Sequence, residues 1–61
     1  MNPTIQAEIN PVIKGMEMYG GSFVKSLANA IHHADMDNAA KIKRAFPEYW
    51  EKYLKIGKEL K

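Results

Sequence analysis

The sequence predicts an all-α fold of three or four short helices, arranged as a helical hairpin or small bundle in one domain over residues 1–61. Apolar residues recur along most of the chain at the three- and four-residue spacing of amphipathic helices. The pair Gly20-Gly21 interrupts this pattern, and Pro11 and Pro47 stand where further helices could begin. These marks divide the chain into its expected helices.

The first expected helix covers about residues 11–19. Asn10-Pro11 suits an N-cap followed by proline at the first helical position, where a missing N–H costs nothing. Beyond it, one face carries the apolar residues Val12, Ile13, Met16 and Tyr19, while Met18 is expected to be exposed. Asn2-Pro3 marks a second, weaker start. Two interpretations of residues 1–10 are therefore left open, a short helix and a loose N-terminal arm.

The paired glycines Gly20 and Gly21 predict a hinge between two helices. Glycine tolerates the positive φ that often ends a helix, and the Ser22 hydroxyl can cap the next one. Over about residues 22–34 the expected core face then carries Phe23, Val24, Leu27, Ala28, Ile31 and Ala34. The opposite, wet face supplies four candidate partner-binding residues, which are Lys25, Asn29, His32 and His33.

Asp35 is the expected N-cap of a third helix over about residues 36–45, and Pro47 the expected first residue of a fourth over about 47–60. The fourth helix has an unusually broad apolar sector, made of Tyr49, Trp50, Tyr53, Leu54, Ile56, Gly57 and Leu60. Together the four stripes predict a core of Phe23, Leu27, Ile31, Ile42, Phe46, Trp50, Tyr53 and Leu54.

The broad apolar sector predicts self-association, most simply as a two-fold homodimer. A chain of 61 residues has a thin core, and it contains no cysteine that could form a disulfide. The expected shared surface consists of Tyr49, Trp50, Tyr53, Ile56 and Leu60. The alternative is that residues 3–19 fold over this face and complete a monomer.

Several function classes lack support in the sequence. His32, His33, Asp35 and Asp37 have the wrong directions for a shared metal, no catalytic triad is readable, and Gly20-Gly21-Ser22 is too short for a phosphate cradle. We therefore expect a protein that is not an enzyme and holds no cofactor. No apolar run reaches the roughly 18 residues of a membrane span, and no signal peptide is readable, so we expect a cytoplasmic protein without a membrane partner.

Charge is uneven along the chain, because residues 41–61 hold seven lysines and arginines against three glutamates. This basic third makes a nucleic-acid partner an alternative to a protein partner. However, Glu48 precedes Lys52, and Glu51 precedes Lys55, by the four residues that favour ion pairs along a helix, and these acids dilute the positive charge.

Two sequence blocks carry a resemblance to known proteins. The first block begins with Met18-Tyr19-Gly20-Gly21-Ser22-Phe23-Val24-Lys25 and continues through Leu27-Ala28, Ala34-Asp35 and Asn38. The second block consists of Ala45-Phe46-Pro47-Glu48-Tyr49-Trp50 with Tyr53. In this pattern the chain resembles a group of very small uncharacterised proteins encoded by tailed phages and prophages. Met36 stands where that group often has proline, which leaves the start of the third helix less firmly set.

The resemblance implies a phage genome context and a bacterial host cytoplasm, but no mechanism. Small phage proteins without enzymatic motifs commonly act by occupying a host protein surface, including components of bacterial immunity. The expected function is therefore binding of a host protein, with inhibition of anti-phage defence as the narrower form. The alternatives are a nucleic-acid-binding accessory factor and a minor structural or assembly protein of the phage particle.

Overall fold

A computed structural model describes residues 3–60 of the chain, and it confirms the all-α fold there, with no strand in that range. The four helices are α1 (Pro3–Tyr19), α2 (Ser22–His33), α3 (Met36–Ala45) and α4 (Pro47–Glu59). The last three begin where the sequence predicts. Asp35 and Pro47 set the starts of α3 and α4 through local effects that need no tertiary contact, and α2 begins directly after Gly20-Gly21. The first helix differs from the prediction.

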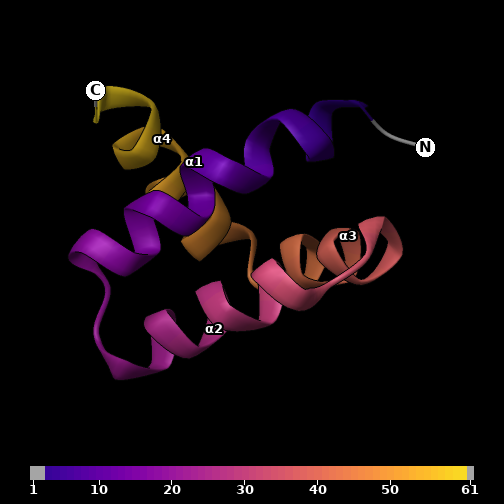
Figure 1. Cartoon of the computed structure of the whole chain (residues 1–61), viewed down its shortest axis with the longest axis horizontal. Coiled ribbons are helices and arrows are strands. Elements are labelled where there is room, and N and C mark those ends of the chain that lie inside the picture. Colours follow the sequence, from indigo (N-terminus) through magenta and orange to yellow (C-terminus); the bar gives the residue numbers. More distant parts are fainter. Residues whose placement is uncertain (1–2, 61) are drawn as a thin grey trace.

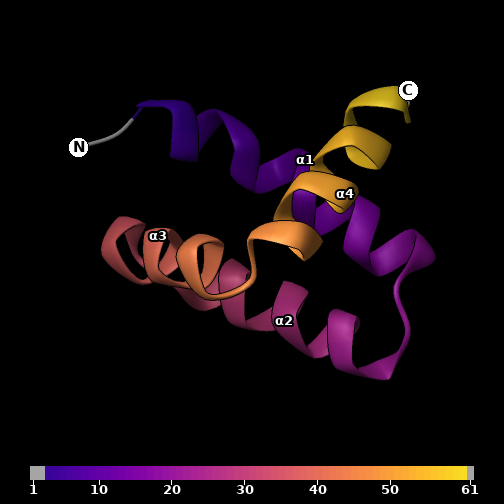
Figure 2. The same ribbon diagram turned by 180° about the vertical axis from the view of Figure 1, so that it is seen from behind.

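The helices pack around a crossing of α1 and α4. Helix α1 lies across α4 and makes its most extensive contacts there, and it also packs along α2 (Figure 1). Helix α3 continues from the end of α2 and lies beside the N-terminal half of α1, as the view from behind also shows (Figure 2). The first helix of the chain is therefore covered by each of the other three.

Helix α1 runs without a break through Pro11, so the expected start at Asn10-Pro11 is wrong, and residues 3–10 are helical rather than a loose arm. Proline leaves one backbone carbonyl of the preceding turn without its helical donor. Packing outweighs that loss, since one continuous face carries Ile5, Ile9, Val12 and Met16 at spacings of four, three and four residues. Of these, Ile5, Val12 and Met16 are buried.

The chain does turn at Gly20-Gly21, but the expected reason is wrong, because neither glycine has a positive φ. Gly21, with φ −78° and ψ −170°, is the N-cap of α2, and Ser22 is the first helical residue rather than the cap. Gly20 is needed for space: a Cβ there would overlap Cγ1 of Val24 and lie 2.6 Å from the carbonyl oxygen of Met16. A Cβ on Gly21 would meet nothing within 4 Å.

The expected helix starts at Asp35 and Pro47 are confirmed. The Asp35 side chain accepts a hydrogen bond of 2.8 Å from the backbone N–H of Asn38, which caps α3. Pro47 occupies the first turn of α4, and Phe46 forms the corner between the two helices with φ −130° and ψ 61°. Met36 in place of proline therefore leaves the start of α3 well defined.

The core agrees with the prediction in its C-terminal half more than in its N-terminal half. Ile31, Trp50, Tyr53 and Leu54 are buried as expected, and Leu27, Ile42 and Phe46 are partly buried. Phe23 is 55% exposed, so its assignment to the core is wrong. Residues outside the predicted list complete the core, namely Ile5, Val12, Met16, Val24, Ala28 and Ala39.

Two glycines let α1 and α4 approach closely at their crossing. A Cβ on Gly57 of α4 would overlap the carbonyl oxygen of Pro11, and a Cβ on Gly15 of α1 would overlap that of Tyr53. Each helix thus presents a glycine to the backbone of the other. Any larger residue at either position would push the two helices apart.

Candidate protein-binding surfaces

Three aromatic side chains from two regions of the chain form a cluster on the surface. Phe23 at the start of α2 lies against Phe46 and Tyr49, with ring centroids 5.8 Å and 6.0 Å away, and the centroids of Phe46 and Tyr49 are 6.1 Å apart. The first pair meets edge to face at 70°, which is a favoured aromatic geometry. We call Phe23, Phe46 and Tyr49 the aromatic cluster.

The aromatic cluster stays open to solvent although its members contact one another. Phe23 is 55% exposed, Tyr49 is 38% exposed and Phe46 is partly buried. Helical spacing predicts Phe23 and Phe46 in the core, because both lie on apolar stripes. In the structure the ring of Phe23 from α2 instead meets the rings of Phe46 at the corner and Tyr49 of α4, and the contact stays open to solvent.

A second apolar feature is an open groove of about 520 Å³ beside α4. Tyr53, Ile56 and Leu60 line it from α4 and its C-terminal end, Tyr19 lines it from the end of α1, and Lys52 and Glu59 add one charge of each sign. The Nζ atom of Lys52 lies 5.3 Å from the centroid of the Tyr53 ring. We call this feature the α4 groove.

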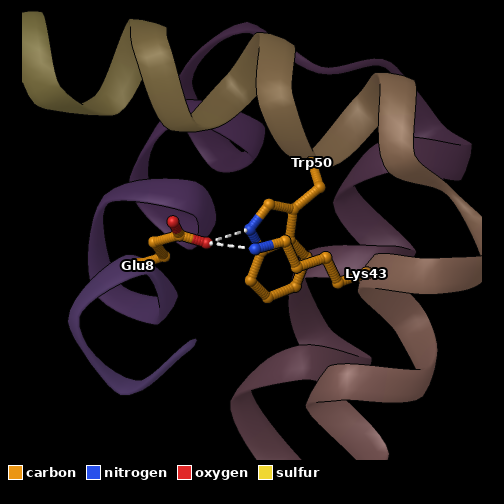
Figure 3. Close-up of polar contacts among 3 residues, drawn as sticks. All are labelled: Glu8, Lys43 and Trp50. Atoms are coloured by element: carbon orange, nitrogen blue, oxygen red, sulfur yellow. Dashed lines mark hydrogen bonds and ion pairs between the residues drawn. The ribbon is translucent and has the colours of Figure 1, made fainter. Parts of the chain in front are cut away.

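A polar contact fixes α1 over the aromatic half of α4 (Figure 3). Oε1 of Glu8 accepts hydrogen bonds from Nε1 of Trp50 at 2.8 Å and from Nζ of Lys43 at 3.0 Å. The Glu8 side chain is only 14% exposed, so its charge is largely shielded from water. The contact joins α1, α3 and α4 through a single carboxylate oxygen.

The pKa of Glu8 lies below its ordinary value. Burial alone would raise this pKa, but the hydrogen bonds from Trp50 and Lys43 and the positive charges of Lys43 and Lys58 lower it by more. Glu8 is therefore held as the carboxylate. No local pattern in the sequence predicts this contact, because 42 residues separate Glu8 from Trp50.

The burial of Trp50 and Tyr53 changes the expected shared surface. Trp50 is 1% exposed and Tyr53 is 5% exposed within the single chain, with α1 packed over α4, so Trp50 is not available to a second copy. This is the alternative in which residues 3–19 cover the last helix. Tyr49, Ile56 and Leu60 keep exposed area, and Tyr53 contributes only at the floor of the α4 groove.

The four polar candidates on α2, Lys25, Asn29, His32 and His33, are all exposed. The rings of His32 and His33 meet edge to face with centroids 5.2 Å apart. By helical spacing Lys25 and His32 lie on the flank of α2 away from Phe23, whereas Asn29 and His33 lie on the wet face between the two flanks. The structure therefore does not gather the four residues with the aromatic cluster.

The described part of the chain holds no group of three or more His, Cys, Asp or Glu side chains that could bind a metal ion. None of its helices combines the length and apolar character that crossing a membrane requires. Among residues 5–60, Glu8 and Lys43 form the only ion pair, so the Glu48–Lys52 and Glu51–Lys55 pairs expected from spacing are not made. Lys52 and Lys55 are exposed cations.

Comparisons with protein families, with curated proteins and with solved structures found no match to this chain. A functional hypothesis for this chain therefore depends on its own surface. Two apolar features on the surface, the aromatic cluster and the α4 groove, are suited to contacts with other proteins.

Proposed function

We propose that this protein is a non-enzymatic binding protein that contacts its partner through the aromatic cluster. In the phage setting that its sequence resemblance implies, the partner is a protein in the cytoplasm of the bacterial host. The narrower form of the proposal is that the partner belongs to an anti-phage defence system. The observation that supports binding is the exposure of Phe23 and Tyr49 side by side.

Exposed aromatic rings in contact are costly for a small protein that has no partner. Phe23 leaves more than half of its surface in water although its neighbours are apolar. Burial of apolar area is worth about 25 cal/mol per Å², and aromatic anchors with few rotatable bonds lose little entropy when they bind. Interface hot spots favour such residues. A partner that covers the cluster would recover this burial.

The charges around α2 and α4 favour a partner whose rim is polar or acidic. Lys25 and Lys52 are exposed, and neither forms an ion pair in the described part of the chain. Interfaces commonly surround an apolar centre with a charged rim that sets specificity and association rate. Lys25, Asn29, His32 and His33 remain proposed partner-binding residues, but as a separate polar surface of α2, because helical spacing places them away from the aromatic cluster.

The test is capture of a host protein by the tagged chain, followed by a binding measurement with the purified partner. We expect Phe23→Ser to weaken binding at least tenfold, as loss of an interface anchor does. Met18→Ser is the matched control, because Met18 is 60% exposed and lies outside the cluster. Thermal melting of both variants checks that the fold is kept. Equal affinities for the two variants would contradict the proposal.

A nucleic-acid partner is the second candidate, since Lys41, Arg44, Lys52, Lys55 and Lys58 of the basic third are exposed. Binding to a phosphate backbone weakens steeply with salt, whereas binding through aromatic anchors does not. Binding that disappears at high salt and with Lys55→Glu, but not with Phe23→Ser, would favour nucleic acid. Binding to phage capsid or tail proteins instead of host proteins would favour a structural role.

A further inference from the structure

We infer that the α4 groove is the docking site for the same helix of a second copy of this chain, running antiparallel across a two-fold axis. The inference concerns a surface other than the aromatic cluster and does not depend on a host partner. Its basis is the order of apolar and charged residues that the groove presents.

The apolar residues on this side of α4 follow the spacing of a helix-pairing seam. Tyr53, Ile56 and Leu60 are separated by three and four residues, which is the repeat that brings two helices into lasting contact. All three line the groove, and Ile56 and Leu60 keep part of their surface exposed. Within the chain, α1 covers only one side of this seam, which is the side where Trp50 and Gly57 contact α1.

The charges beside the seam are self-complementary only when the two helices run in opposite directions. Lys52 and Glu59 lie seven residues apart, so they share one edge of α4, about 10 Å from each other. In an antiparallel pair, Lys52 faces Glu59 of the partner subunit, and Glu59 faces Lys52 of the partner subunit. Flanking charges of this kind set the orientation of paired helices. Each copy thus supplies one residue to each of two ion pairs.

This register leaves the aromatic cluster free. Pairing Lys52 with Glu59 of the partner subunit places the two-fold axis near Ile56, and Tyr49 then lies beyond the end of the partner helix. A dimer would therefore present two aromatic clusters, one at each end. Because only six residues of each chain line the groove, we expect an interface in the class of small, weak and reversible contacts, with association only at high protein concentration.

The experiment is analytical ultracentrifugation of the full chain from about 10 μM to 1 mM, a range that suits weak interfaces. We expect the parent to dimerise. Lys52→Glu and Glu59→Lys should each weaken the dimer about tenfold or more, because each replaces two attractive contacts by two repulsive ones. An equimolar mixture of these two variants should form a heterodimer, and the double variant should dimerise like the parent.

The matched controls are Lys55→Glu and Glu51→Lys, which make the same charge changes on the wet face of α4 and should leave dimerisation unchanged. Ile56→Glu, in the groove itself, should abolish it. Far-ultraviolet circular dichroism verifies that each variant is helical. A parent that stays monomeric at 1 mM, a mixture that does not associate, or controls that act like the groove variants would overturn the inference.

Discussion

The indole Nε1 of Trp50 donates a hydrogen bond of 2.8 Å to Oε1 of Glu8, at the place where α1 passes over α4. The same oxygen accepts from Lys43 of α3, whose Nζ also lies 6.0 Å from the centroid of the Trp50 ring. Trp50 is the largest fully buried side chain, so this contact satisfies the one polar atom that its burial brings into the core. The N-terminal half of α1 is thereby fixed in place.

Removing the Glu8 carboxylate should destabilise the fold. We expect Glu8→Ala to lower the free energy of unfolding by about 1–3 kcal/mol, because the Trp50 N–H would lose its partner in a largely buried site. Glu8→Gln should cost less, since an amide oxygen can still accept from Trp50. Urea denaturation followed by tryptophan fluorescence measures both. Glu17→Ala, at an exposed position of the same helix, is the control, and an equal loss there would contradict the assigned role.

Stability should fall in acid as Glu8 takes up a proton. The folded state lowers the pKa of Glu8 below its ordinary value, so the unfolded chain binds the proton more readily. The contribution of Glu8 to the free energy of unfolding is therefore fully present above the ordinary glutamate pKa. It is lost as the pH falls through the lower pKa that Glu8 has in the folded state. Thermal melting between pH 7 and pH 3 should show this loss, and Glu8→Gln should reduce it. An identical pH profile for that variant would count against the contact.

Gly57→Ala should destabilise the protein although alanine favours helices. In an open helix this change stabilises by up to about 1 kcal/mol, but here the added Cβ overlaps the carbonyl oxygen of Pro11. We expect a loss of about 1–3 kcal/mol, typical of overpacking. Gly15→Ala should behave in the same way against Tyr53. Chemical denaturation tests both, and a free energy of unfolding at or above that of the parent would exclude the close crossing of α1 and α4.

The two glycines of the turn should respond differently to the same substitution. Gly20→Val should lower the melting temperature by several degrees, because the new side chain meets Val24 and Met16. A loss of about 1 kcal/mol in the free energy of unfolding has this effect in a domain of this size. Gly21→Val should change it less, since a Cβ there has open space and φ is −78°, and only the poor N-cap preference of valine counts against it. Gly21→Ser, which adds a capping hydroxyl, should be neutral or stabilising. Equal losses at the two glycines would refute this distinction.

The starts of α2, α3 and α4 could be predicted because local chemistry sets them. Gly20-Gly21, the Asp35 cap and Pro47 each act within one helical turn of their own position, and the helices begin beside them in the structure. The apolar faces of α2 and α4 were also readable from spacing. The aromatic cluster was not, because a stripe shows which residues avoid water but not which of them a neighbouring helix will reach.

By itself, the sequence determined that the chain is helical, where three of the four helices begin, and that α4 carries a broad apolar face. Only the tertiary structure decided that α1 continues through Pro11 and covers that face, since its burial of Ile5, Val12 and Met16 outweighs a lost hydrogen bond. It also decided that Phe23 lies outside the core and that Glu8 meets Trp50. Local hydrogen bonds and steric limits act between neighbours in sequence, whereas burial depends on which helices meet.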